Sequence, residues 1–106
     1  MSKSLRRFEI LLPRRFNDQQ AVPDELMVET ALDLERQFGS VSAETQIIRG
    51  LWHHEGQSDR DELIRVFVDV PDTPENMRFF EEFKEQLKAR FRQLDIWMTT
   101  YLVEVL

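Results

Sequence analysis

The fold is decided by residues 63–91, which read LIRVFVDVPDTPENMRFFEEFKEQLKARF. The first eight residues alternate between two faces, which is the period of a half-buried strand over 63–70. Thr73 is then placed to cap a helix whose first residue is Pro74, because proline there gives up no hydrogen bond. Apolar residues follow at helical spacing, namely Phe80, Phe83, Leu87 and Phe91. The stretch therefore predicts a strand and then a helix that ends near Arg92 or Gln93.

The same pair of patterns occurs nearer the N-terminus. Residues 5–12 alternate and predict a strand that Pro13 closes. Residues 14–22 have no apolar period and predict a loop. A helix is then expected over 23–38, because acidic residues in its first turn favour the helix dipole and Gly39 can take the left-handed conformation after its end.

Two further strands complete the chain. Residues 41–55 predict one long strand, and the turn chemistry of residues 56–59 joins it as a hairpin to the strand over 63–70. Residues 96–106 are rich in β-branched and aromatic side chains and predict the last strand.

The element order βαββαβ matches the ferredoxin-like split βαβ motif. It predicts one α+β domain over residues 1–106, with a four-stranded antiparallel sheet in the order 4-1-3-2 and both helices on one face. The core expected from the sheet consists of Phe8, Ile10, Leu12, Ile48, Ile64, Val66, Val68, Ile96 and Met98. The core expected from the helices consists of Met27, Ala31, Leu34, Phe38, Phe80, Phe83, Leu87 and Phe91.

Composition and charge limit the class of protein. A chain of 106 residues with 42% hydrophobic residues can bury a core without disulfides or metal. Because 14 Lys and Arg stand against 20 Asp and Glu, the net charge of -6 disfavours nucleic acid or an anionic membrane as partner. The absence of cysteine excludes thiol nucleophiles and thiolate metal sites, and it fits a cytoplasmic protein.

The sheet face opposite the helices is expected to be partly apolar, which is typical of a partner surface or a ligand cleft. The binding or interface residues predicted there are Leu11, Arg49, Leu51, His53, Arg65, Phe67, Trp97 and Tyr101. We expect a homodimer that packs two sheets together or pairs edge strands, acting as an interaction or regulatory module. The alternatives are another protein partner, or a small-molecule-binding protein or enzyme of the dimeric α/β-barrel type with a cleft on this face.

Catalytic chemistry is weakly supported by the sequence. The run His53-His54-Glu55 suggests a metal site, but adjacent side chains of a strand point to opposite faces, so neither a metal nor a cofactor is predicted. Glu9, His53, Asp69 and Tyr101 have acid-base chemistry. Ion pairs of Arg65 with Glu9 or Asp69 across neighbouring strands explain the presence of most of these residues without any catalytic role. No catalytic residue is predicted, and whether the protein is an enzyme stays open, with the balance against it.

Several motifs give the chain a resemblance to known proteins. They are Gly50-x-Trp52, Arg60-Asp61-Glu62, the run from Val68 to Asn76, Phe91-x-Gln93 and Asp95-Ile96-Trp97-Met98. In these motifs the chain resembles a group of small bacterial proteins of unknown function. The resemblance implies a bacterial, cytosolic, ferredoxin-like domain, and it carries over no functional residue.

Overall fold

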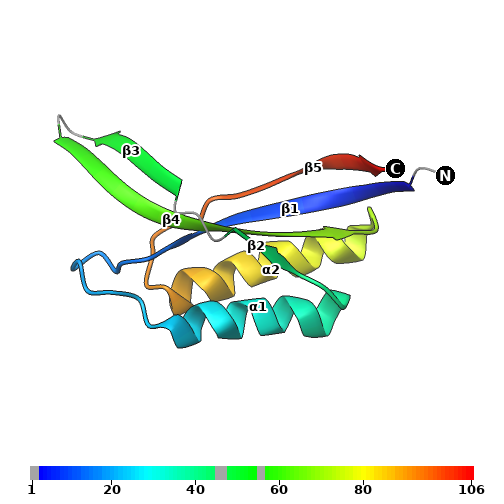
Figure 1. The fold of residues 1–106 in the computed structure, drawn as a ribbon, viewed down its shortest axis with the longest axis horizontal. Coiled ribbons are helices and arrows are strands. Elements are labelled where there is room, and N and C mark those ends of the chain that lie inside the picture. The colour runs from blue at the N-terminus through cyan, green and yellow to red at the C-terminus, as the bar shows by residue number, and fades with distance from the viewer. Residues whose placement is uncertain (1–2, 45–47, 55–56) are drawn as a thin grey trace.

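Two helices lie along one face of an antiparallel sheet (Figure 1). The structure, a computed structural model, describes residues 3–44, 48–54 and 57–106, and for 48–54 and 57–61 it describes the backbone alone. The elements are β1 (Lys3–Pro13), α1 (Asp24–Phe38), β2 (Ser42–Ala43), β3 (Ile48–His54), β4 (Gln57–Val70), α2 (Pro74–Arg90) and β5 (Met98–Val105).

The strands follow the order β2-β4-β1-β5, with β3 also paired to β4. Since β2 and β3 share the place of the predicted second strand, this is the expected order 4-1-3-2 in reverse. Strand β1 is central, with Phe8 opposite Val68 of β4 on one side and opposite Thr100 of β5 on the other. The ferredoxin-like α+β fold is therefore confirmed.

The region before β4 departs from the prediction. The single strand expected over 41–55 is wrong, because β2 pairs with Val66 and Phe67 in the second half of β4, whereas β3 pairs with residues 57–63 at its start. The turn expected at 56–59 is also wrong for 57–59, since β4 begins at Gln57 opposite His54. Residues 57–62 are polar and show no alternation, so only their backbone pairing with β3 reveals the strand. Residues 55 and 56 lie outside the described residues.

The helix ends follow capping chemistry. Pro23 precedes α1 by one residue instead of opening it, and Gly39 ends α1 with φ 84° and donates its N–H to the carbonyl of Glu35 at 2.7 Å. At α2, the Thr73 hydroxyl accepts the N–H of Asn76 at 3.2 Å, as predicted.

Helix α2 ends at Arg90, two residues before the predicted stop, without a glycine. Arg92 takes the left-handed conformation at φ 54°, and Gln93 donates its N–H to the carbonyl of Lys88 at 2.9 Å, which closes the last turn. The Arg92 guanidinium lies 4.5 Å from the ring centre of Phe16, a contact that favours this conformation.

The core lies between the helices and the covered face of the sheet. Most of the predicted core is buried, and the Phe8 and Phe80 rings stack at 3.8 Å between ring centres. Predicted residues that are only partly buried are Ile64, Met98, Met27, Ala31 and Phe38. The side chain of Ile48 lies outside the described residues. Buried residues absent from the prediction are Phe16, Val22, Thr30, Leu63 and Val70.

Phe16 and Val22 belong to the loop over 14–22. The N–H of Arg14 bonds the carbonyl of Glu62 at 3.1 Å, and the N–H of Val22 bonds the carbonyl of Arg14 at 2.8 Å. These bonds fold the loop back onto the end of the sheet, and its two apolar residues are buried in the core. Two isolated apolar residues have no period, so the pattern could not reveal them.

Candidate functional site

The open face is the sheet face opposite the helices. Its side chains alternate along β1 and β4 with the buried ones, because successive residues of a strand point to opposite faces. From β1 and β4 the described open-face residues include Arg7, Glu9, Leu11, Arg65, Phe67 and Asp69. From β5 and the residue before it they include Trp97, Thr99, Tyr101 and Val103.

Five of the predicted site residues meet on this face. Leu11 lies opposite Arg65 in the sheet register, and the N–H of Leu11 donates to the carbonyl of Trp97 at 3.0 Å. Phe67 and Tyr101 lie on the two strands that flank β1.

The other three predicted residues, Arg49, Leu51 and His53, belong to β3, where their backbones pair with Glu62, Arg60 and Ser58. Their side chains lie outside the described residues.

Phe67 lies at the centre of the open face between two cations. The guanidinium carbon of Arg7 is 4.7 Å from the ring centre, and that of Arg65 is 5.5 Å away. Both distances fit cation–π contacts. The ring of Phe67 therefore lies beside both guanidinium groups.

Arg7 forms a two-point ion pair with Asp69. Its Nε donates to Oδ1 at 2.7 Å and its Nη2 donates to Oδ2 at 2.9 Å, with both side chains about three-quarters buried. The hydrogen bonds to Asp69 raise the pKa of Arg7, so its charge is fixed. The predicted pairing of Asp69 with Arg65 is wrong, because Arg7 lies directly opposite Asp69 in the register.

A second network joins Tyr101 to Arg65 through a carboxylate. The Tyr101 hydroxyl donates to Oε1 of Glu9 at 2.6 Å, and Nη1 of Arg65 lies 3.5 Å from the same oxygen, as predicted for this pair. Arg65 also pairs with Glu44, which follows β2. The bond to Glu9 raises the pKa of Tyr101, so the phenol stays a donor at neutral pH.

The sequence prediction missed Arg7 and Glu44 in these networks. Arg7 alternates with Phe8 and Ile10 along β1, so its place on the open face was available from the period. Glu44 had no such signal, because it reaches Arg65 only through the pairing of β2 with β4.

The charges of the open face compensate one another. The two arginines are compensated by Glu9, Glu44 and Asp69, and the residue types present include no thiol nucleophile. In the part of the chain that the structure describes, no cluster of three metal-ligating side chains occurs. No helix there is long and apolar enough to cross a membrane.

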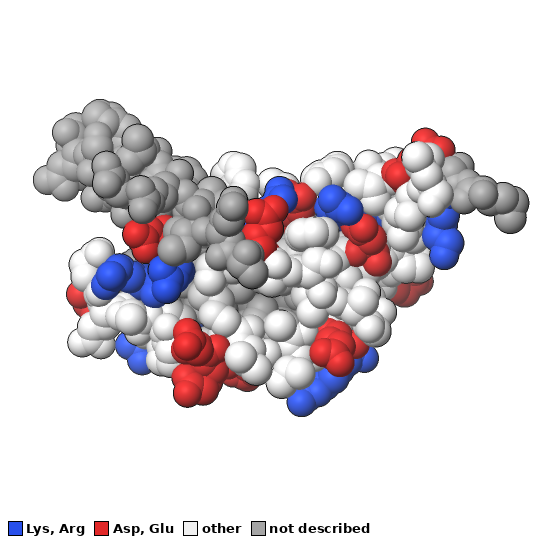
Figure 2. Space-filling view, viewed as in Figure 1, with Lys and Arg blue, Asp and Glu red and all other residues white. Residues whose placement is uncertain are grey.

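Charges are spread over the molecule. On the side seen in Figure 2, acidic and basic side chains alternate over the helices and the sheet, with no broad basic surface. The described part of this side therefore carries no continuous positive track of the kind that binds a nucleic-acid backbone.

The border of the open face differs from its centre, because apolar side chains lie exposed along β5. Tyr101 and Leu102 are 43% and 59% exposed, and Val105 is also exposed. Trp97, the residue just before β5, is exposed as well. Tyr101 and Val105 lie on the open face, and Leu102 lies on the helix side, opposite Arg6. In the described chain, β5 ends the sheet and pairs only with β1.

Structural comparisons give the fold. A scan against protein-family models and a search of curated proteins find no match. A phage SAM lyase in complex with S-methyl-5'-thioadenosine aligns at TM-score 0.69 and 11% identity, covering 95% of this chain and 88% of that one. The divalent cation tolerance protein CutA1 of Thermus thermophilus aligns at TM-score 0.61 and 17% identity, covering 95% and 82%. At these identities the likeness establishes a shared fold alone.

Proposed function

We propose that this protein is an interaction module that assembles with a second copy of itself through the outer edge of β5. The observation that carries the proposal is an uncovered edge strand with exposed apolar side chains on both of its faces. A long apolar edge is a template for pairing with another strand.

The hydrogen-bonding groups at this edge follow from the register. Leu11 and Trp97 share a hydrogen bond, and in an antiparallel pair every second residue pair does so. The β5 residues that lie between these hydrogen-bonded pairs are therefore Met98, Thr100, Leu102 and Glu104. Their N–H and C=O groups point outward. The strand contains no proline, lysine or arginine to block an incoming strand.

A second copy fits this edge because β5 can pair with an identical strand. Two antiparallel copies related by a two-fold axis place the same apolar residues on both sides of the junction. Tyr101 and Val105 would then pack on one face of the joined sheet and Leu102 on the other. Each large apolar side chain buried in this way contributes about 1 to 2 kcal/mol.

The test is the solution mass by light scattering, at protein concentrations from about 5 to 500 µM, a range that spans ordinary homodimer affinities. The wild type is expected to be a dimer. At the low end of this concentration range Thr100→Pro should be monomeric, because it removes an outward N–H and leaves the ladder to β1 intact. Thr100→Val keeps that N–H and should stay dimeric. A wild type that is monomeric throughout, or a folded Thr100→Pro that is still dimeric at the low end of the range, would overturn the proposal.

The apolar anchor beside the edge gives a second measurement. Trp97 is the residue just before β5 and is 56% exposed, and aromatic residues dominate interface energies. Trp97→Arg is expected to weaken the dimer about 10- to 100-fold, which corresponds to about 1.4 to 2.8 kcal/mol. An unchanged dissociation constant would show that Trp97 lies outside the interface. The backbone pairing of β5 would then be tested by Thr100→Pro alone.

A second candidate function is binding of a small molecule at the centre of the open face. The observation that favours it is the Nε of Arg65, which is buried and has no hydrogen-bond partner among the described residues, beside the ring of Phe67. An aromatic ring with neighbouring hydrogen-bond donors and carboxylates suits a planar polar ligand such as a nucleoside.

Calorimetric titration with S-methyl-5'-thioadenosine, the ligand of the phage SAM lyase with the same fold, tests this candidate. Binding that is lost in Glu9→Gln and Arg65→Met, and retained in Arg78→Met on α2, would support it. The absence of heat at millimolar ligand would exclude this nucleoside as the ligand.

A further inference from the structure

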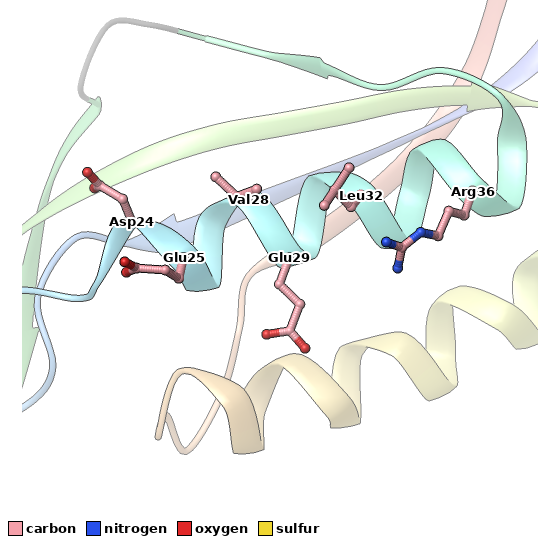
Figure 3. Close-up of a pocket in the computed structure, with 6 residues that line it drawn as sticks. All are labelled: Asp24, Glu25, Val28, Glu29, Leu32 and Arg36. Carbon is pink, nitrogen blue, oxygen red and sulfur yellow. The ribbon is translucent and has the colours of Figure 1, made fainter.

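A shallow groove runs along the outer side of α1, away from the open face and from β5. It is lined by Asp24, Glu25, Val28, Glu29, Leu32 and Arg36. Figure 3 shows Val28 and Leu32 side by side in the middle of the helix, with Asp24 and Glu25 at one end and Arg36 at the other. Val28 and Leu32 are 55% and 38% exposed, although both are apolar.

The charged side chains at the two ends of this groove form no ion pairs with described residues, unlike the carboxylates that lie between α1 and α2. Glu29 and Asp33 are held by Arg90 of α2, whose Nη2 lies 3.4 and 2.8 Å from their oxygens. Asp24, Glu25 and Arg36 form no ion pair with any residue in the described ranges 3–44, 48–54 and 57–106. The groove therefore carries two unpaired carboxylates, an apolar centre and one unpaired cation, in that order along the helix.

We propose that the groove binds α1 of a second copy of this chain in an antiparallel arrangement. A two-fold axis at the level of residue 30 places Arg36 of one copy beside Asp24 and Glu25 of the other, and Val28 beside Leu32 of the other. Positions 24 and 36 are twelve residues apart, which is about 18 Å along the helix. Two antiparallel copies of α1 can therefore form both charge contacts and the apolar contact along one straight interface. A purely basic peptide would meet Arg36, whereas an identical helix places each Arg36 beside the carboxylates of Asp24 and Glu25. Glu29, which lies near the axis, is already paired with Arg90 of its own chain.

The contact is small, because one helix face buries less than the roughly 800 Å² per partner of a stable interface. We expect a dissociation constant on the order of 0.1 to 1 mM. The groove lies on α1 and the proposed dimer edge lies on β5, so the two contacts are independent. Because a β5 dimer carries two copies of the groove, the two contacts together should raise the mass above that of the β5 dimer at high protein concentration.

Sedimentation equilibrium of charge-swap variants tests the arrangement. Arg36→Glu alone and Asp24→Lys with Glu25→Lys should each lose the concentration-dependent rise in mass, by at least tenfold in the dissociation constant. An equimolar mixture of the two variants should restore it, because every contact then joins opposite charges. Arg78→Glu and Glu81→Lys with Glu82→Lys, exposed on α2, are matched controls and should behave as wild type.

Melting curves check that the variants fold, and Glu25→Lys replaces the double variant if the latter melts early. The same series in the Thr100→Pro background separates this contact from the β5 edge, because there the α1 contact alone should convert monomer to dimer. Equal association of wild type and Arg36→Glu in that background, or failure of the mixture to associate, would overturn the proposal whatever the fate of the β5 edge.

Discussion

The two faces of the sheet are built from the same strands and stabilised in different ways. On the covered face, Phe8 and Ile10 of β1 are 2% and 1% exposed and pack against aromatic side chains of α2. On the open face, Arg7 and Glu9 of the same strand are held by ion pairs and hydrogen bonds to Asp69, Arg65 and Tyr101. Burial is favourable in proportion to apolar area, whereas partly exposed ion pairs contribute little. The covered face should therefore determine most of the stability, and the ion pairs of the open face should contribute little to it.

The strongest test of this comparison removes a ring from the covered face. Phe80 is 1% exposed and stacks on Phe8. Phe80→Ala leaves a cavity that the surrounding helices and strands cannot fill, so the free energy of unfolding should fall by about 3 to 5 kcal/mol. Urea denaturation followed by circular dichroism measures it. A loss below about 1 kcal/mol would mean that this core relaxes far more than packed interiors usually do.

A smaller effect is expected when the main ion pair of the open face is broken. Arg7→Met and Asp69→Asn should each lower the free energy of unfolding by about 1 kcal/mol, since both side chains are about three-quarters buried. The double variant should lose less than the sum of the two single variants, because one interaction is shared. Additive losses in the urea midpoints would show that the pair contributes nothing to stability.

The two faces of the sheet also differ in how much of their structure the sequence could predict. On the covered face, apolar side chains repeat at periods of two or about 3.6, so the pattern located Phe8, Val66, Phe80 and Leu87 in the core. The start of β4 has no such repeat, and the sequence read residues 57–59 as a turn, although pairing with β3 keeps them in a strand.

The open face could be located from the sequence, but its contacts could not. Alternation placed Phe67 and Tyr101 on this face. Which arginine meets which carboxylate depends on the register, because a cross-strand partner is fixed by the ladder and not by the chain. Arg7 reaches Asp69 for this reason, and Glu44 enters the network only because β2 pairs with β4.

The smallest expected effect is a shift in the ionisation of one side chain of the open face, the Tyr101 hydroxyl. Tyr101 is the single tyrosine of the chain, so absorbance at 295 nm reports its ionisation alone. Its hydrogen bond to the Glu9 carboxylate raises its pKa above the ordinary 10.0, and the midpoint should lie above that value in the folded protein. Because the pKa is higher folded than unfolded, the bond stabilises the protein below pH 10 and this contribution disappears as pH rises through the folded pKa.

Glu9→Gln keeps an acceptor and removes the charge, so it should move the midpoint back toward that of the unfolded protein in urea. Arg7→Met should raise the midpoint instead, because Arg7 lowers the pKa of Tyr101. Opposite shifts in these two variants would place both charges around the phenol, as the register of β1 against β5 requires. A wild-type midpoint at or below the ordinary value would show that the hydroxyl is solvated, and the open face would then be a set of independent surface charges and not a network.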